Sequence, residues 1–278
     1  MRKTSRSIIL GLCLILILVT GCSSSKKTES AIADGTLTIG LECDYAPYNY
    51  TTTEALKTDN ALPISGSAGY CDGYDIAIAD RIAKALNVKV EVKKMSWDGL
   101  IPALESGQID AIIAGMSPTA ERKKSIDFTD SYFHADIVDT VVVKKDGKYA
   151  NANSLDGFSG AKITAQQGTV QVKLVSQLKG VTEVANMPDY SSLIQSLKAG
   201  TIDGYIAEES VAKEHVEQNS DFKYIPLNFT LTAEDTDVAI GISKDQTELK
   251  DKLNEALKTI SDQERQELMN YYISKESK

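Results

Sequence analysis

The sequence predicts an α/β fold of two lobes, each a mainly parallel sheet flanked by helices, with a ligand cleft between them. Three observations carry this prediction: strand-like and helix-like apolar patterns alternate, one helix–strand unit occurs twice, and the composition is that of a folded protein. The 278 residues are 42% hydrophobic, 25% charged and 6% aromatic. A formal net charge of −9 argues against nucleic-acid binding. Two histidines and four cysteines are little material for a zinc site, and we expect neither a metal nor a cofactor.

The N-terminus has the pattern of a secretory signal over residues 1–21. Basic residues precede the apolar run Ile8–Val19, which as a helix is about 18 Å long and too short for a bilayer core of about 30 Å. A buried N-terminal helix is the alternative, but no polar face marks one. Val19-Thr20-Gly21-Cys22 resembles the lipobox of bacterial lipoproteins, which implies cleavage before Cys22 and acylation of its thiol. The acyl chains would anchor the protein without spanning the membrane.

Residues 22–33 are expected to be a flexible tether, because Ser23–Ser30 is rich in Ser, Lys and Thr. Cleavage would remove three basic residues and change the formal charge from −9 to −12. Of the cysteines, Cys13 leaves with the signal and Cys22 carries lipid. Cys43 and Cys71 remain as an even pair in an oxidising compartment, which leaves open either a disulfide or two free buried thiols.

The mature chain begins with alternating strand and helix patterns. Thr36–Leu41 alternates as a strand, and Asp75 is an N-cap candidate for a helix whose apolar face extends to Leu86. Val88, Val90 and Val92 alternate as a second strand. Such alternation predicts mainly parallel pairing.

The most informative feature is an internal repeat. Leu100–Gly115 and Leu193–Glu208 are identical at eight of sixteen positions. Each unit reads as a helix, a terminating glycine and a buried strand. Chance similarity between helix–strand units is the alternative; we interpret the repeat as two lobes built alike. Ligands of such sheets bind beyond the carboxyl ends of the strands, which are Gly115 and Glu208 here.

The C-terminal part completes the predicted organisation. Val238–Ile242 has a strand pattern, and two helices follow, one with its apolar face over Leu249–Ile260. No Gly/Pro-rich linker separates the halves, so we expect more than one crossing between lobes. The predicted division is lobe 1 at 34–134 and 236–278, lobe 2 at 135–235, and hinges at His134–Val138 and Thr232–Val238.

Four polar segments carry a resemblance to a known family: Glu42–Tyr48, Gly73–Asp75, Trp97–Leu100 and Gly115–Tyr132. They resemble the polar amino-acid class of bacterial extracellular solute-binding proteins (family 3), the ligand-delivering components of ABC importers. The resemblance extends from about Leu37 to Tyr272, and Gly115–Arg122 followed by Asp127-Phe128 is its most specific part. It implies a type II periplasmic-binding-protein-like fold, a free amino acid as ligand and a membrane permease as partner.

The resemblance also implies roles for residues around the ligand backbone. Arg122 would hold the α-carboxylate through two parallel hydrogen bonds; a surface arginine beside two lysines is the alternative. Ser117 offers a hydroxyl and an N–H, and Gly115 offers close approach and a carbonyl. Thr169, before a helix expected over Val170–Leu178, would complete the carboxylate site. Glu208 would take the α-ammonium, unless it is a solvated acid or the adjacent Glu209 has that role.

The ligand's side chain would lie between Tyr45 and Trp97, near the acid Glu42. Core packing is the alternative for the single tryptophan. An acid between aromatic walls favours a cationic ligand, so we expect arginine, lysine or histidine, with glutamine next. Tyr50 and the segment Thr51–Gly69 depart from the family pattern and could reshape this end.

Two other classes of function compete with amino-acid transport. The fold also resembles cyclohexadienyl dehydratases, in which Glu208 or Glu42 could serve as the acid; a surface adhesin is the other. We expect no enzyme, no catalytic residue, and surface or structural roles for His134 and His215. The expected protein is a monomer, lipid-anchored on the outer face of the cell membrane, or on the periplasmic side in a two-membrane cell.

Overall fold

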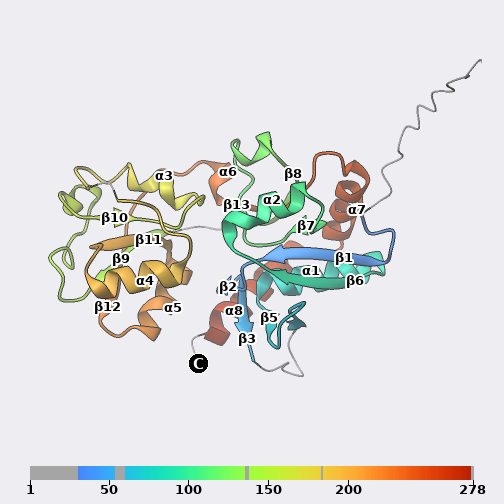
Figure 1. The fold of residues 1–278 in the computed structure, drawn as a ribbon, viewed down its shortest axis with the longest axis horizontal. Coiled ribbons are helices and arrows are strands. Elements are labelled where there is room, and N and C mark those ends of the chain that lie inside the picture. Colours follow the sequence, from blue (N-terminus) through green and yellow to red (C-terminus); the bar gives the residue numbers. More distant parts are fainter. Residues whose placement is uncertain (1–30, 54–59, 135–137, 183, 277–278) are drawn as a thin grey trace, which may run out of the picture.

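The computed structural model describes residues 31–53, 60–134, 138–182 and 184–276, and shows two α/β bodies side by side (Figure 1). The predicted two-lobed α/β fold is confirmed. The predicted signal segment, Cys13 and Cys22 lie outside the described residues. The tether was extended too far, because Ile32 is buried in the core of the first lobe.

The first lobe is built on a five-stranded sheet in the order β6-β1-β7-β13-β8. The central strand pairs are parallel, whereas β13 is antiparallel to both of its neighbours. The strands are β1 (Thr36–Leu41), β6 (Lys89–Lys94), β7 (Ala111–Ile112), β8 (Asp127–His134) and β13 (Asp237–Ile242). The helices are α1 (Tyr74–Leu86), α2 (Leu100–Glu105), α7 (Thr247–Lys258) and α8 (Asp262–Glu276), with 3-10 turns at Trp97–Gly99 and Arg122–Lys124.

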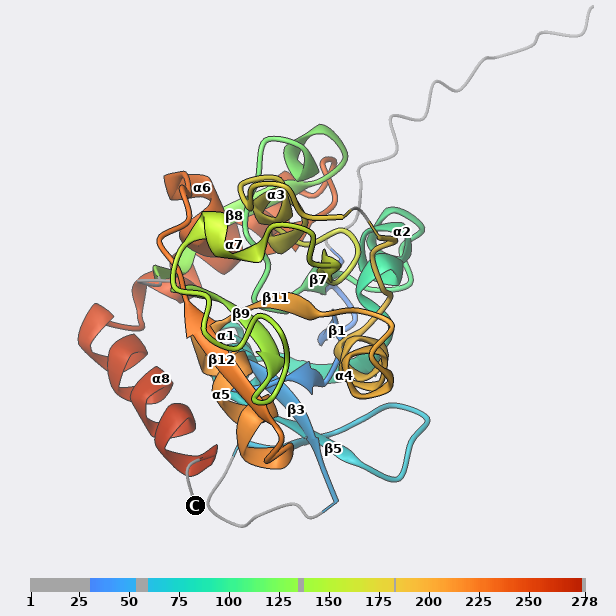
Figure 2. The ribbon, with the colours of Figure 1, turned by 90° about the vertical axis from the view of Figure 1, so that its left-hand side faces the viewer.

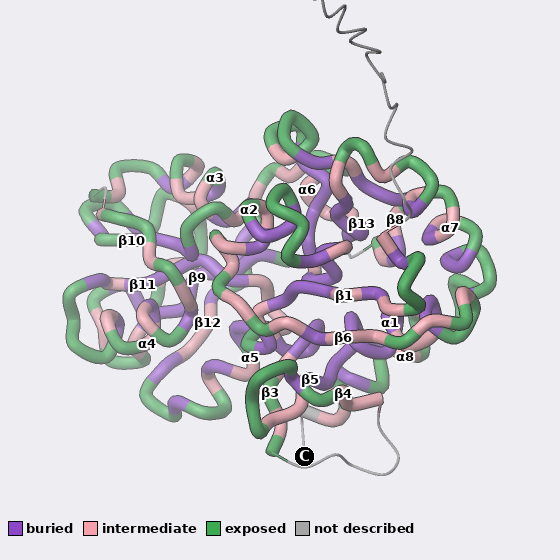
Figure 3. The backbone as a smooth tube through the Cα atoms, turned by 45° about the vertical axis from the view of Figure 1, so that its right-hand side comes forward, coloured by how far each residue is buried: buried purple, intermediate pink, exposed green. Residues whose placement is uncertain are grey.

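The second lobe has a four-stranded sheet in the order β10-β11-β9-β12. Its elements are β9 (Asp139–Lys144), the 3-10 turn Leu155–Phe158, β10 (Ile163–Thr164), α3 (Gln171–Val175), α4 (Tyr190–Ala199), β11 (Gly204–Glu208), α5 (Glu209–Gln218) and β12 (Phe222–Pro226). Leu174 of α3 packs in one core cluster, and Leu193 of α4 and Val211 of α5 pack in another. Figure 2 faces this lobe, and Figure 3 shows the buried strands of both lobes under exposed loops.

The sheets are mixed, which corrects the expectation of mainly parallel pairing. Among the strands of the second-lobe sheet, β10 pairs with β11 in parallel, whereas β9 is antiparallel to both β11 and β12. The reason lies in the crossings between lobes. The chain leaves β8 for β9, and returns from β12 through α6 (Ala233–Thr236) to β13. The outgoing and returning strands run side by side in opposite directions: β8 with β13 and β9 with β12.

The repeat has a structural cause. Gly107 and Gly200 follow the matched helices with φ of +71° and +73°, a conformation that L side chains rarely adopt. The Asp110 carboxylate accepts the Thr38 N–H at 2.8 Å, and the Asp203 carboxylate accepts the Lys162 N–H at 2.8 Å. The same residue types therefore end the helix and fasten the neighbouring chain segment in each lobe.

Asp75 is not the N-cap that its position suggested. The N-cap is Gly73, with φ of +123°, where a Cβ would lie 2.4 Å from the Tyr48 carbonyl oxygen. The Asp75 carboxylate is instead buried, accepting bonds from Tyr132 Oη at 2.6 Å and Asn49 Nδ2 at 2.8 Å. In the motif Gly73-Tyr74-Asp75, the glycine thus lets the backbone at Tyr48 pack closely against the start of α1. The aspartate holds Tyr132 and Asn49 together in the core of the first lobe.

The segment that departs from the family pattern contributes β4 and most of β3 to a small sheet on the first lobe, in the order β2-β3-β5-β4. Its strands are β2 (Asp44–Tyr45), β3 (Asn49–Thr52), β4 (Leu62–Pro63) and β5 (Tyr70–Asp72). Cys43 and Cys71 form a disulfide that ties the loop after β1 to β5. Thr51 Oγ1 donates to the Cys43 carbonyl at 2.8 Å. The small sheet therefore supports the loop that leads from Glu42 to Tyr45.

Candidate functional site

A pocket lies between the lobes and brings together all eight residues predicted to bind ligand. The first lobe contributes Glu42, Tyr45, Trp97, Gly115, Ser117 and Arg122, the second lobe Gln166, Thr169, Val170, Gln171, Tyr190 and Glu208, and the returning crossing Asp235. No described residue between 50 and 69 lines it. The roles of the eight predicted residues toward a ligand remain predictions.

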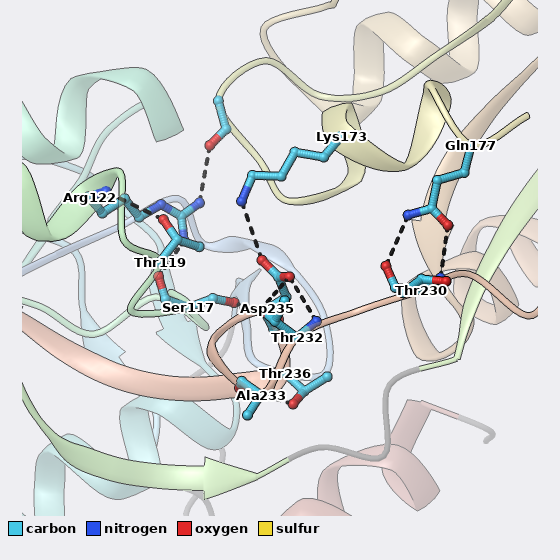
Figure 4. Close-up of polar contacts among 11 residues, drawn as sticks. Ser117, Thr119, Arg122, Lys173, Gln177, Thr230, Thr232, Ala233, Asp235 and Thr236 are labelled. Atoms are coloured by element: carbon cyan, nitrogen blue, oxygen red, sulfur yellow. Dashed lines mark hydrogen bonds and ion pairs between the residues drawn. The ribbon is translucent and has the colours of Figure 1, made fainter.

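Arg122 points into the pocket and is not an exposed surface arginine. Its Nη1 donates to the Ser117 carbonyl at 2.7 Å and its Nη2 to the Gly168 carbonyl of the second lobe at 3.1 Å (Figure 4). The guanidinium also lies 5.0 Å from the centroid of the Trp97 ring. Burial lowers the pKa of Arg122 to about 10, so it remains cationic at neutral pH. A half-buried cation at a pocket wall suits a carboxylate partner.

Ser117 joins the first lobe to the crossing segment. Its hydroxyl donates to the Asp235 carbonyl at 3.1 Å, while the Asp235 carboxylate accepts from Lys173 Nζ at 3.4 Å (Figure 4). Asp235 also completes a capping box with Thr232 at the start of α6. Sequence reasoning missed Asp235, although the Thr-x-x-Asp spacing was visible. These bonds place Asp235 at the junction of both lobes and the pocket.

Gly115 is a glycine for two local reasons. Its φ is +61°, and a Cβ there would lie 2.8 Å from Tyr45 Cε1. Its N–H donates to Tyr132 Oη at 3.2 Å, and that hydroxyl donates to Asp75. The buried Asp75 network therefore fixes the backbone at the pocket wall.

Glu208 faces the pocket from the carboxyl end of β11. Burial, with the nearby negative charge of Asp139, raises the pKa of Glu208 to about 7, and a hydrogen bond from Tyr45 opposes the shift. Glu209 does not line this pocket but a neighbouring one behind it. Glu208, rather than Glu209, is therefore the acid that lines the same pocket as Arg122.

The other end of the pocket is closed by Glu42 and Gln166. Gln166 Nε2 donates to Glu42 Oε1 at 2.9 Å and to the Pro188 carbonyl at 3.1 Å. Burial raises the pKa of Glu42 to about 7, and the charges of Asp44 and Asp189 act in the same direction. Glu42 lines the pocket, and the charges of Asp44 and Asp189 reach it from outside the lining, so this end favours a cation.

Thr169 lies at the pocket, but its surroundings differ from the prediction. Its hydroxyl donates to the Gln166 carbonyl at 2.8 Å. The helix that follows is α3, which spans only Gln171–Val175 rather than Val170–Leu178. A single turn has a weak dipole, so the backbone N–H groups matter more here than the helix.

Sequence reasoning missed five pocket residues: Gln166, Val170, Gln171, Tyr190 and Asp235. Gln166 lies three positions before the predicted Thr169, while Tyr190 follows Asp189, whose side chain caps α4. Nothing in the local pattern distinguishes Tyr190 from an ordinary core aromatic, because its role depends on the other lobe.

The two histidines lie outside the pocket. His134 is exposed and its Nδ1 lies 2.5 Å from Asp237 Oδ1 on the neighbouring strand. His215 is buried against Tyr205, and burial lowers its pKa to about 4. Of the two roles expected for His215, surface or structural, its burial therefore fits the structural one. Within the described ranges, no cluster of three His, Cys, Asp or Glu side chains could hold a metal, and no helix there is long and apolar enough to cross a membrane.

Comparisons with known proteins agree on one family. The sequence profile of the bacterial extracellular solute-binding proteins, family 3, matches residues 37–275. The arginine-binding extracellular protein ArtP of Bacillus subtilis is 32% identical over 89% of both chains. The glutamine-binding protein GlnH of an ABC transporter from the same organism is 29% identical over 84% of this chain and 80% of its own.

Solved structures show the same similarity. The amino-acid ABC transporter substrate-binding protein AbpA of Streptococcus pneumoniae, bound to L-arginine, has a TM-score of 0.73 at 30% identity, covering 88% of this chain and 97% of that one. An ancestral arginine-binding protein bound to glutamine has a TM-score of 0.69 at 33% identity, covering 86% and 97%.

Proposed function

Because the chain belongs to the bacterial extracellular solute-binding proteins, family 3, we propose that it binds one free L-amino acid between its lobes and delivers it to an ABC transporter permease. One observation carries the proposal: Arg122 from the first lobe and Glu208 from the second line the same pocket. A cation and an acid on opposite walls match the carboxylate and ammonium of an amino acid.

Closing the lobes is the step that the ligand would drive. A zwitterion held by Arg122 on one lobe and Glu208 on the other contacts both at once, so it stabilises their closed arrangement. Ser117, Gly115 and Thr169 would supply the remaining polar contacts around the ligand backbone. Micromolar affinity corresponds to about 8 kcal/mol, which such a clamp with one enclosed side chain can reach.

The preferred ligand carries a basic side chain: arginine first, then lysine or histidine, with glutamine next. Glu42 faces this end of the pocket, with Asp44 and Asp189 close enough to raise its pKa. The relatives named for arginine and for glutamine support the same choice. Gln166 adds an amide that could pair with a guanidinium or with a ligand amide.

The site is proposed to bind without catalysis. A dehydratase would use Glu208 or Glu42 to protonate a leaving hydroxyl, whereas here both acids serve as charge partners. Incubation with prephenate or arogenate should yield no product. Lipid attachment at Cys22, with the mature monomer held on the outer face of a membrane, completes the proposal.

The direct test is a thermal-shift screen of the twenty amino acids with the purified protein. A ligand that binds only the folded state raises the melting temperature in proportion to the logarithm of its concentration once it is in excess. We expect a basic amino acid to give the largest shift. A protein whose melting temperature responds to none of the twenty would contradict the proposed function.

A further inference from the structure

Tyr45 is the described residue through which the cores of the two lobes meet. It belongs to the first lobe, yet it packs against a core cluster of each lobe, as no other described residue does. Its ring lies parallel to that of Tyr48 in its own lobe, with centroids 5.1 Å apart and 7° between planes. It lies equally parallel to Tyr190 of the second lobe, at 6.2 Å and 5°.

The second lobe holds Tyr190 in position for this contact. Tyr190 is only 5% exposed, and the His215 ring meets it edge-on, with centroids 4.9 Å apart. His215 Nδ1 is itself 3.0 Å from Tyr205 Oη, inside the lobe. These contacts belong to one lobe alone and do not depend on how the lobes are arranged.

The Tyr45 hydroxyl strengthens the same junction by donating to Glu208. The ring contact and this hydrogen bond join one lobe directly to the other. Other direct bonds between the lobes use the charged or amide groups of Arg122, Glu42 and Gln166, which an amino acid would also engage. Both rings also line the pocket, but the contact between them uses no charge, so it contributes to closing whichever ligand is bound.

We propose that the contact between Tyr45 and Tyr190 is a built-in closing contact, which raises affinity for every ligand by one common factor and selects none. An aromatic pair of this kind corresponds to about a fivefold change in the closing equilibrium. Affinity scales with the fraction of molecules in the binding-competent arrangement, so this equilibrium sets affinity. Tyr190 then acts as a positioning residue. The claim that the contact raises affinity rests on the proposed function. The claim that the contact stabilises the closed arrangement does not.

Closing can be measured without ligand through Trp97, the single tryptophan. Trp97 lies on the first lobe, and a Cβ at Gly168 of the second lobe would lie 3.5 Å from its Nε1. Opening the lobes exposes this ring, so acrylamide quenching of its fluorescence reports the closed fraction. We expect Tyr190→Leu to increase quenching, consistent with a closing equilibrium about fivefold weaker, and Tyr190→Phe to quench like the wild type.

The matched control is Tyr149→Leu, which removes a ring packed on Phe158 within the second lobe, with centroids 6.2 Å apart. Its quenching should equal that of the wild type. Circular dichroism verifies folding, and Tyr190→Met replaces the leucine variant if that variant does not fold. Equal quenching of the wild type and the folded variant, Tyr190→Leu or Tyr190→Met, would overturn the proposal.

Affinity gives a second readout that a merely structural role would not produce. Tyr190→Leu should raise the Kd for L-arginine and L-glutamine by the same factor, up to about fivefold, and leave their ratio unchanged. A changed ratio would mean that Tyr190 selects the ligand, which overturns the proposal. If the wild type binds no amino acid, the proposed function fails, while the quenching result still decides the closing contact.

Discussion

At the scale of single residues, the pocket holds a cation and two acids on different walls, and one small molecule could pair with all three. Arg122 is fixed by the Ser117 carbonyl and packs over Trp97, so its cation is held in place before any ligand arrives. Glu208 and Glu42 are acids whose pKa values burial raises to about 7. All three groups are costly to bury alone, and a zwitterion with a basic side chain would offset each cost.

The first prediction concerns Arg122. Replacing it by alanine should weaken amino-acid binding by roughly 2–5 kcal/mol, or at least about 30-fold, because the ligand carboxylate loses its cation. Calorimetric titration measures the change. Lys124→Ala is the matched control, since Lys124 is exposed and paired with Glu121 outside the pocket. Equal affinities for all three proteins would refute the clamp.

The second prediction concerns pH. Below a pH of about 7, Glu208 and Glu42 are increasingly protonated, because burial raises the pKa of each to about that value. A ligand cation needs the charged form, so affinity for L-arginine should rise from pH 5.5 to 8 and then level off. Titrations across this range measure it. Affinity that is flat or falls with increasing pH would contradict the assignment of these acids.

The third prediction concerns the cost of Glu208 to stability. The folded protein binds a proton at Glu208 up to a pH of about 7, whereas a glutamate in the unfolded chain releases its proton near the ordinary pKa of 4.5. This group therefore lowers the free energy of unfolding as the pH rises through that window. Glu208→Gln should raise the melting temperature at pH 8 while weakening binding. A lower melting temperature would show that the acid stabilises the fold.

The resemblance of short motifs to a known family selected eight candidates at charged, aromatic, hydroxyl and glycine positions. All eight line one pocket, while their roles toward a ligand stay predictions. Tyr190 carried no local signal, and the Thr-x-x-Asp spacing at Asp235 indicated only the start of a helix. Both residues reach the pocket only when the lobes and the crossing segment come together. Asp75 was misassigned for a similar reason: its partners Tyr132 and Asn49 lie far along the chain.

At the scale of elements, the disulfide and the repeated helix–strand units position the segments that line the pocket. The link between Cys43 and Cys71 holds the segment that carries Glu42 and Tyr45 against the small sheet. The repeated helix–glycine–strand units end at Gly115 in one lobe and Glu208 in the other. The sequence could show this duplication directly, but it could not show strand direction, which depends on the two crossings.

The fourth prediction tests the disulfide. Replacing both Cys43 and Cys71 by serine opens a link between residues 28 positions apart, which in the chain-entropy account costs about 3–4 kcal/mol of stability. Denaturant unfolding measures it, and a reducing agent should produce a similar loss in the wild type. Unchanged stability in both experiments would indicate that the link contributes little to the fold.

At the scale of the whole molecule, two lobes meet over one pocket and are joined by two crossings. The returning crossing is fastened to both sides, through Ser117 in one lobe and Lys173 in the other (Figure 4). The ring of Tyr45 adds an uncharged contact between the cores. Closing is thus shared between contacts that the protein makes with itself and contacts that only a ligand can supply.

The central claim is that Arg122 and Glu208 together hold the backbone of one amino acid. The most direct measurement is a calorimetric comparison of the best-binding L-amino acid with the amine that lacks its α-carboxylate. We predict one site per chain for the amino acid and at least about 30-fold weaker binding of the amine, because Arg122 then has no carboxylate partner. Equal affinity for both compounds would contradict the account.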